Sequence, residues 1–107
     1  MMLTRTFEKS IRERVKSDRD FKIELLVEAA NSFLQGEPET ARLILRDLVN
    51  ATVGFEALAK QLGVPAGRLH SMLSVTANPS MSHLSAIFEA LQKELKVSLL
   101  AEAKIRG

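Results

Sequence analysis

The chain has 107 residues, of which 46% are hydrophobic and 26% charged, and its formal net charge is +2. This composition is that of a single globular domain and excludes an intrinsically disordered chain. The absence of cysteine excludes disulfides and thiolate metal sites, and the absence of a run of about 18 apolar residues excludes a bilayer-spanning helix. The start MMLTRTFEKS lacks the apolar stretch of a secretory signal. We therefore expect an intracellular, cytoplasmic protein without a membrane partner.

Two helices are expected in the first 36 residues. The first has apolar residues four positions apart: Phe7, Ile11 and Val15. It should cover about residues 5–16. The second is expected from about 18 to Gly36, because the segment SDRD resembles a capping box, and its inward face should extend to Phe33. Residues 1–22 carry seven Lys or Arg against four Asp or Glu. This excess suits either a solvated helix face or one that faces phosphates.

Four further helices follow, so the expected fold class is all-α. The segment GEP ends the second helix and begins a third over about 38–51, with Arg42 expected off its apolar seam. Two short helices are expected next, each with an apolar stripe of barely two turns, one around Leu58 and one around Leu69. After the turn Asn78-Pro79, the last helix begins with Ser80 or Ser82 as its cap.

No repeat or long linker divides the chain, so residues 1–107 are expected to form a single domain. Within it we distinguish N-terminal helices over 1–36, a core over 37–96 and a tail over 97–107. The tail is compatible with two structures. Apolar and polar residues alternate as in a half-buried strand, but Leu, Ala, Glu and Lys also favour helix. We favour a short β-strand, whose second strand would most simply be the same segment of a two-fold related copy.

The stretch GFEALAKQLGVPAGRLHSML, residues 54–73, contains two seams that are too short to be stable as isolated helices. Ala59 is small where the two helices must cross, and Gly63 can take the positive φ of a sharp turn. Pro65 can begin the next helix without leaving a backbone donor unpaired. This spacing is typical of a helix-turn-helix, whose second helix projects into the major groove, although other α-hairpins share the central glycine.

The longer segment GEPETARLILRDLVNATVGFEALAKQLGVPAGRLHSMLSVTANPSMSHLSAIFEALQKELKVSLL, about residues 36–101, resembles the addiction-module antidote proteins, or HigA-like antitoxins, of bacterial toxin-antitoxin pairs. Its most specific parts are GEPE, LRDLVNA, ALAKQLGVPAGRLHSML and the turn NPS. The resemblance implies a lambda-repressor-like helix-turn-helix domain with two extra N-terminal helices. It also implies a transcriptional repressor that binds double-stranded DNA at its own promoter as a homodimer, with a RelE-like or HigB-like toxin as partner.

The resemblance places the recognition helix from Pro65 to about Ser74. Its groove-facing residues would be Ala66, Gly67, Arg68 and Ser71. Arg68 is the candidate base reader, because a guanidinium can donate two hydrogen bonds to guanine. The alternative for Arg68 is a solvated surface charge. Ser71 would touch a base edge or a phosphate, or be a plain surface serine.

Contacts with the DNA backbone are expected from positions around this helix. Thr52 could cap the fourth helix and leave its N–H groups free for a phosphate. Lys60, Asn78 and Ser80 are similar candidates, with Lys60 as a solubilising charge the alternative. Ala66 and Gly67 stand where related repressors often place long polar side chains, and His70 where the family commonly has an aromatic residue. A second hypothesis is therefore a protein-interaction module, toxin-neutralising or a scaffold, that lacks sequence-specific DNA binding.

No catalytic or cofactor-binding motif is recognisable. The chain has no G-x-S-x-G, G-x-G-x-x-G, P-loop or H-E-x-x-H, and His70 and His83 have no cysteine with which to complete a zinc site. We therefore expect neither an enzyme nor a bound cofactor or metal.

Overall fold

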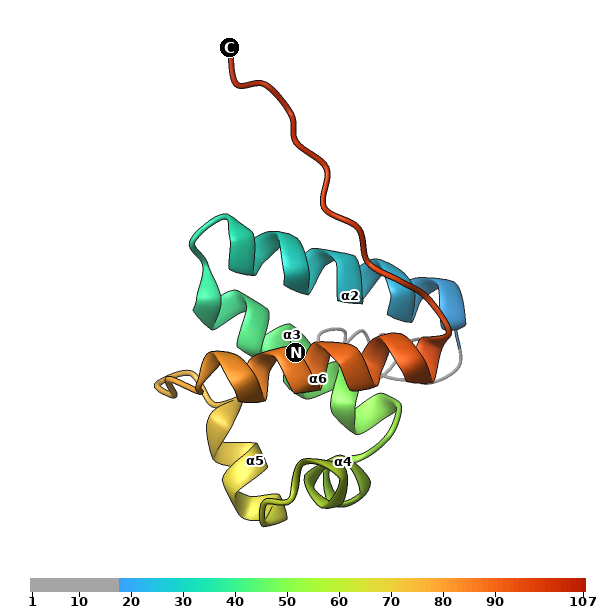
Figure 1. Cartoon of the computed structure of the whole chain (residues 1–107), viewed down its shortest axis with the longest axis vertical. Helices are drawn as coiled ribbons and strands as arrows, with labels where there is room; N and C mark the ends of the chain where they lie inside the picture. Colours follow the sequence, from blue (N-terminus) through green and yellow to red (C-terminus); the bar gives the residue numbers. More distant parts are fainter. Residues whose placement is uncertain (1–17) are drawn as a thin grey trace, which may run out of the picture.

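The computed structural model describes residues 18–107, and this part of the chain forms five α-helices and no β-strand (Figure 1). In chain order they are α2 (Arg19–Leu34), α3 (Pro38–Ala51), α4 (Phe55–Leu62), α5 (Ala66–Met72) and α6 (Met81–Leu95). The helix expected over residues 5–16 lies outside the described residues. The all-α prediction is confirmed for the described part, with helix ends close to those expected. Among residues 18–107, no helix has both the length and the apolar character that a bilayer crossing needs.

A hairpin of α2 and α3 forms one end of the molecule (Figure 1). The side chain of Asp18 caps α2, where it accepts a hydrogen bond of 3.1 Å from the backbone N–H of Phe21. At the other end of α2, Gly36 has a φ of 82°, and the N–H of Glu37 donates to the carbonyl of Ser32 at 2.8 Å. Only glycine takes this left-handed conformation without strain. Pro38 then begins α3, as expected.

An aliphatic core joins this hairpin to the short helices α4 and α5. Its largest fully buried side chains are Leu26, Leu45, Leu48, Val49, Leu58, Leu69, Leu73, Ile87 and Leu91. Helix α6 runs across the middle of the molecule and contacts both α2 and α4 (Figure 1). Its C-terminal end is held by Arg19, whose Nη2 donates to the carbonyl of Leu95 at 2.6 Å. Phe33 is less buried than expected, with 39% of its surface exposed, because it lies in a groove between α2 and α6.

The tail forms neither the favoured strand nor a helix. Lys96 takes a left-handed conformation, with φ 58° and ψ 47°, and ends α6. The N–H of Leu99 donates to the side-chain oxygen of Gln92 at 2.8 Å, and every residue from Leu100 onward is exposed. A strand needs a partner for its backbone groups, and residues 18–107 of one chain offer none. The strand prediction is therefore wrong for the single chain.

Replacing Lys96 with glycine is expected to raise the free energy of unfolding by about 1 kcal/mol. A residue with a Cβ is strained in the left-handed region by about 1–2 kcal/mol, and the greater freedom of glycine in the unfolded chain offsets part of the gain. Lys96→Ala removes the same charge but keeps the Cβ, so its stability should stay close to that of the wild type. Urea unfolding of the three proteins measures the difference. Equal stability of the glycine and alanine variants would contradict the strain.

Candidate nucleic-acid interface

A left-handed turn at Gly63 sets the angle between α4 and α5. Gly63 has φ 71° and ψ 31°, and its N–H donates to the carbonyl of Lys60 at 3.2 Å. The N–H of Val64 donates to the carbonyl of Ala59 at 3.0 Å, which completes the hydrogen-bond pattern of a Schellman motif. The predicted turn is therefore present. Pro65 was expected to begin the next helix, but it is the extended N-cap residue, so α5 begins one residue later at Ala66. The carbonyl of Pro65 accepts the N–H of Leu69 at 3.2 Å.

The inner face of α5 holds the short helix against the core. Leu69 and Leu73 are fully buried, and Ala59 of α4 is 2% exposed. On the side of α5 toward α4, the imidazole of His70 stacks on the ring of Phe55, with centroids 3.7 Å apart and planes 11° from parallel. His70 thus makes the ring contact that an aromatic residue would make at this position, which assigns it a packing role.

The outer face of α5 exposes three of the four expected recognition residues. Gly67, Arg68 and Ser71 are exposed, whereas Ala66 is half-buried and packs against the core. Ala66 is therefore less accessible to a DNA groove than the other three, because part of its surface is covered by the core. Within residues 18–107, the side chain of Arg68 makes no hydrogen bond or ion pair, so its guanidinium is available to a ligand. The hydroxyl of Ser71 donates to the carbonyl of Gly67 at 3.1 Å, which leaves its oxygen lone pairs for an external donor.

A shallow groove of about 430 Å³ brings α5 together with the N-terminus of α6. Four of the predicted contact residues line it: Arg68, Ser71, Asn78 and Ser80. His83 was not among the predicted contact residues, but it lines the same groove, and its Nδ1 lies 3.1 Å from Oγ of Ser80. The backbone N–H of His83 also donates to this Oγ at 3.1 Å, which makes Ser80 the N-cap of α6. The spacing Ser-x-x-His after the turn NPS was the signal that could have indicated this pair.

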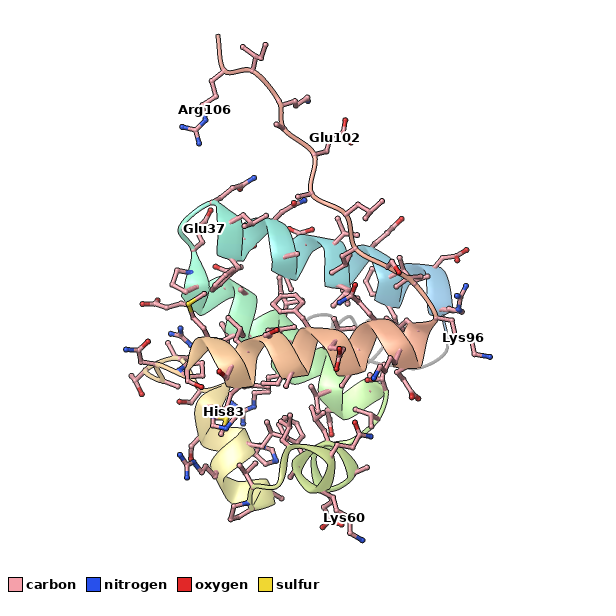
Figure 2. The ribbon with its side chains drawn as sticks, viewed as in Figure 1. Glu37, Lys60, His83, Lys96, Glu102 and Arg106 are labelled. Atoms are coloured by element: carbon pink, nitrogen blue, oxygen red, sulfur yellow. The ribbon has the colours of Figure 1, made fainter. Side chains whose placement is uncertain are left out.

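Thr52 and Lys60 do not line this groove. Thr52 ends α3 and does not cap α4, because its hydroxyl donates to the carbonyl of Leu48 at 2.5 Å and Gly54, with φ 86°, is the residue that precedes α4. The capping role predicted for Thr52 is therefore wrong. Lys60 is exposed on α4 and points away from the body of the molecule, whereas His83 lies beside α5 (Figure 2).

Arg42 fixes the segment that links α5 to this groove. It was expected off the apolar seam of α3, but it is only 8% exposed. Its Nε donates to the carbonyl of Ser74 at 2.9 Å and its Nη2 to the carbonyl of Val75 at 2.7 Å. A guanidinium can hold two successive carbonyls because its donors form a planar fork. Arg42 therefore determines where the chain leaves α5 and begins the turn toward Asn78.

The charge of the helical body is nearly balanced. Residues 18–107 contain ten Lys or Arg and eleven Asp or Glu, whereas residues 1–17 contain five and two. The net positive charge that a polyanion would meet therefore belongs to the first 17 residues of the sequence. In the part of the chain that the structure describes, no group of three or more His, Asp or Glu is placed to hold a metal ion.

Comparisons of the chain with models of known protein families, with characterised proteins and with solved structures find no match.

Arg42→Ala is expected to lower the free energy of unfolding by about 2–3 kcal/mol. The substitution leaves the two turn carbonyls without their charged donor and opens space in a buried position. Arg46→Ala, on an exposed position one turn along the same helix, is the matched control and should change stability by less than about 0.5 kcal/mol. Urea unfolding gives both values, and similar losses for the two variants would refute the role assigned to Arg42.

Gly67→Ala is expected to raise the free energy of unfolding by about 0.5–1 kcal/mol. Glycine is a weak helix former, and a Cβ at position 67 would meet no atom within 4 Å. The same exchange at Gly63 should be destabilising, because its φ of 71° strains any residue with a side chain. Thermal unfolding should separate the two alanine variants in opposite directions from the wild type.

Proposed function

We propose that this protein is a transcriptional regulator that binds duplex DNA as a homodimer through the outer face of α5. The observation that carries the proposal is the convergence of Arg68, Ser71, Asn78 and Ser80 on one exposed groove. The turn at Gly63 supports it, since this turn holds the buried face of α5 against the core and leaves the opposite face to solvent.

In this mechanism α5 reads bases and the start of α6 binds the phosphate backbone. The unengaged guanidinium of Arg68 would donate two hydrogen bonds to O6 and N7 of a guanine. Ser71, whose hydroxyl proton is engaged by Gly67, would accept a hydrogen bond from a base amino group, and Asn78 would contact a base edge or a phosphate. At Ser80 and His83, an approaching phosphate would meet the positive end of the α6 dipole.

Such a site requires two copies to be selective. A helix of seven residues is about 10 Å long and can contact only a few base pairs. Two copies of α5 about 34 Å apart would read two half-sites on one face of the duplex. Because the described body carries no excess positive charge, affinity should depend strongly on a few cations, with Arg68 foremost and the basic segment 1–17 as an additional source.

The resemblance of residues 36–101 to addiction-module antidotes extends the proposal. It suggests that the regulator is the antitoxin of a toxin-antitoxin pair, that it represses its own promoter and that a RelE-like or HigB-like toxin is its protein partner. The neighbouring reading frame tests this part directly, because the proposal expects it to encode a small toxin.

The second candidate function is a protein-interaction module without sequence-specific DNA binding. The near-balanced charge of residues 18–107 favours it, as do the exposed apolar side chains of Leu34 and Met81, which keep 70% and 83% of their surface accessible. A salt titration separates the two functions. Fluorescence anisotropy should show micromolar or tighter binding to duplex from the upstream region that weakens steeply as salt rises. The absence of binding at low salt would favour the interaction module.

Arg68→Ala is expected to remove most of the preference for the upstream duplex over a random duplex of equal length. The loss should correspond to about 1–3 kcal/mol of discrimination, with an unchanged melting temperature because Arg68 is exposed. Lys93→Ala removes another exposed cation, from the C-terminal half of α6, and should leave the preference intact. If Arg68→Ala weakens binding to both duplexes equally, Arg68 contacts phosphate and does not read a base.

A further inference from the structure

We propose that an apolar groove between α2 and α6 binds the C-terminal tail of a second copy of the chain, so that two copies exchange their tails. This proposal specifies the interface of the homodimer that the proposed function requires. It rests on that function only for the need for a dimer, since it concerns a surface that shares no lining residue with the groove around Arg68.

The apolar groove has a volume of about 290 Å³ and lies beside the point where the tail begins. Phe33 and Leu34 line it from α2, Met81 and Phe88 from α6, and Leu99 from the tail. Leu34 is 70% exposed and Met81 83% exposed. A larger depression of about 850 Å³, lined by Leu34, Leu99 and the following tail residues, adjoins it along α2. The larger depression has a mixed polar and apolar lining, whereas the apolar groove brings together the exposed side chains of Leu34 and Met81, as an interaction site does.

The tail supplies apolar side chains that its own chain does not bury. Val97 and Leu99 are half-buried against the core, and Gln92 holds the backbone of Leu99. Beyond this anchor the tail extends away from the helices (Figure 1). Leu100 is 90% exposed and Ile105 100% exposed. Successive side chains of an extended chain alternate in direction, so Ala101, Ala103 and Ile105 follow the side that Leu99 presents to the groove.

A second copy is the occupant that fits these observations. The hydrogen bond to Gln92 directs the chain outward, and the tail has no glycine or proline before Gly107 with which to reverse. The eight residues after Leu99 can reach about 26–29 Å when extended, which is enough to cross to a neighbouring molecule. Because each copy has both a free tail and an open groove, a two-fold exchange fills both grooves at once.

Charge also favours this pairing. Glu24 and Glu28 are exposed on α2, one turn apart, on either side of Val27, which lines the larger depression. The end of the tail carries Lys104 and Arg106 on either side of Ile105. Within residues 18–107 of one chain, none of these four charges forms an ion pair. An exchanged tail would bring cations toward the acidic face of α2 in the other copy.

Sedimentation velocity of the full chain without DNA tests the proposal. Concentrations from about 1 to about 100 μM cover dissociation constants in the micromolar range. The wild type should sediment as a dimer of twice 11.9 kDa. Ile105→Asp, on the tail, and Leu34→Asp, in the groove, should each weaken dimerisation at least about tenfold, because a charge replaces a buried apolar side chain. Leu43→Asp places the same charge at an exposed apolar position of α3 that lines neither depression, so this matched control should remain dimeric. At concentrations low enough for the wild type to dissociate, the Leu34→Asp and Ile105→Asp variants should have the same melting temperature as the wild type, since the two positions are exposed.

Because the chain has no cysteine of its own, introduced cysteines are the only thiols that a cross-linker can join. Cross-linking can therefore show which groove residue contacts which tail residue. An equal mixture of Leu34→Cys and Ile105→Cys proteins should give a dimer-sized product with a short bis-maleimide. Three results would each overturn the exchange. They are a wild type that stays monomeric at about 100 μM, a dimer that survives both Leu34→Asp and Ile105→Asp, and a chain with both Leu34→Cys and Ile105→Cys that cross-links only within itself. An intact dimer that fails to bind DNA would instead refute the proposed function and leave the exchange standing.

Discussion

The position of α5 depends on the burial of two leucines, Leu69 within this seven-residue helix and Leu73 at its C-cap. Isolated helices of this length are unstable in water, and no side-chain cap stabilises the start of α5. Leu69 and Leu73 are fully buried, so the core holds the helix and fixes which of its faces is exposed. The left-handed turn at Gly63 sets its start, and Arg42 sets the path of the chain after its end. Without these three constraints, Arg68 and Ser71 would have no defined position relative to Asn78 and Ser80.

The same core connects two surfaces with different chemistry. One is the polar groove between α5 and the start of α6, which contains hydroxyl, amide and guanidinium groups suited to a polyanion. The other is the apolar groove between α2 and α6, next to a tail that buries none of its last residues in its own chain. Helix α6 and its N-cap contribute to both surfaces. Ser80 and His83 line the polar groove, and Met81 and Phe88 line the apolar groove. A partner bound to either surface would therefore contact the same helix.

The charge distribution limits what the polar groove can do by itself. A nearly neutral helical body gives little non-specific attraction to DNA, so individual contacts and the number of copies matter more than they do in strongly basic binders. The resemblance to antidotes and the geometry of α5 support a regulator, whereas the neutral body and the apolar groove also suit a protein-binding role. The two proposed functions would use separate surfaces and are therefore compatible in one molecule.

The sequence by itself determined the class of fold, the number of helices after residue 18 and the turns between them. It could do so because apolar spacing, glycine, proline and serine act over three or four neighbouring residues, as at Gly36, Gly63 and Ser80. With the resemblance to antidotes, it also singled out Arg68, Ser71, Asn78 and Ser80 as candidate contacts, one by one. Only the tertiary structure decided that these four share a groove with His83, that the core covers part of Ala66 and that Thr52 ends α3. Likewise, the buried role of Arg42 depends on carbonyls 32 and 33 positions away. Such contacts join segments distant in sequence, so no local pattern contains them.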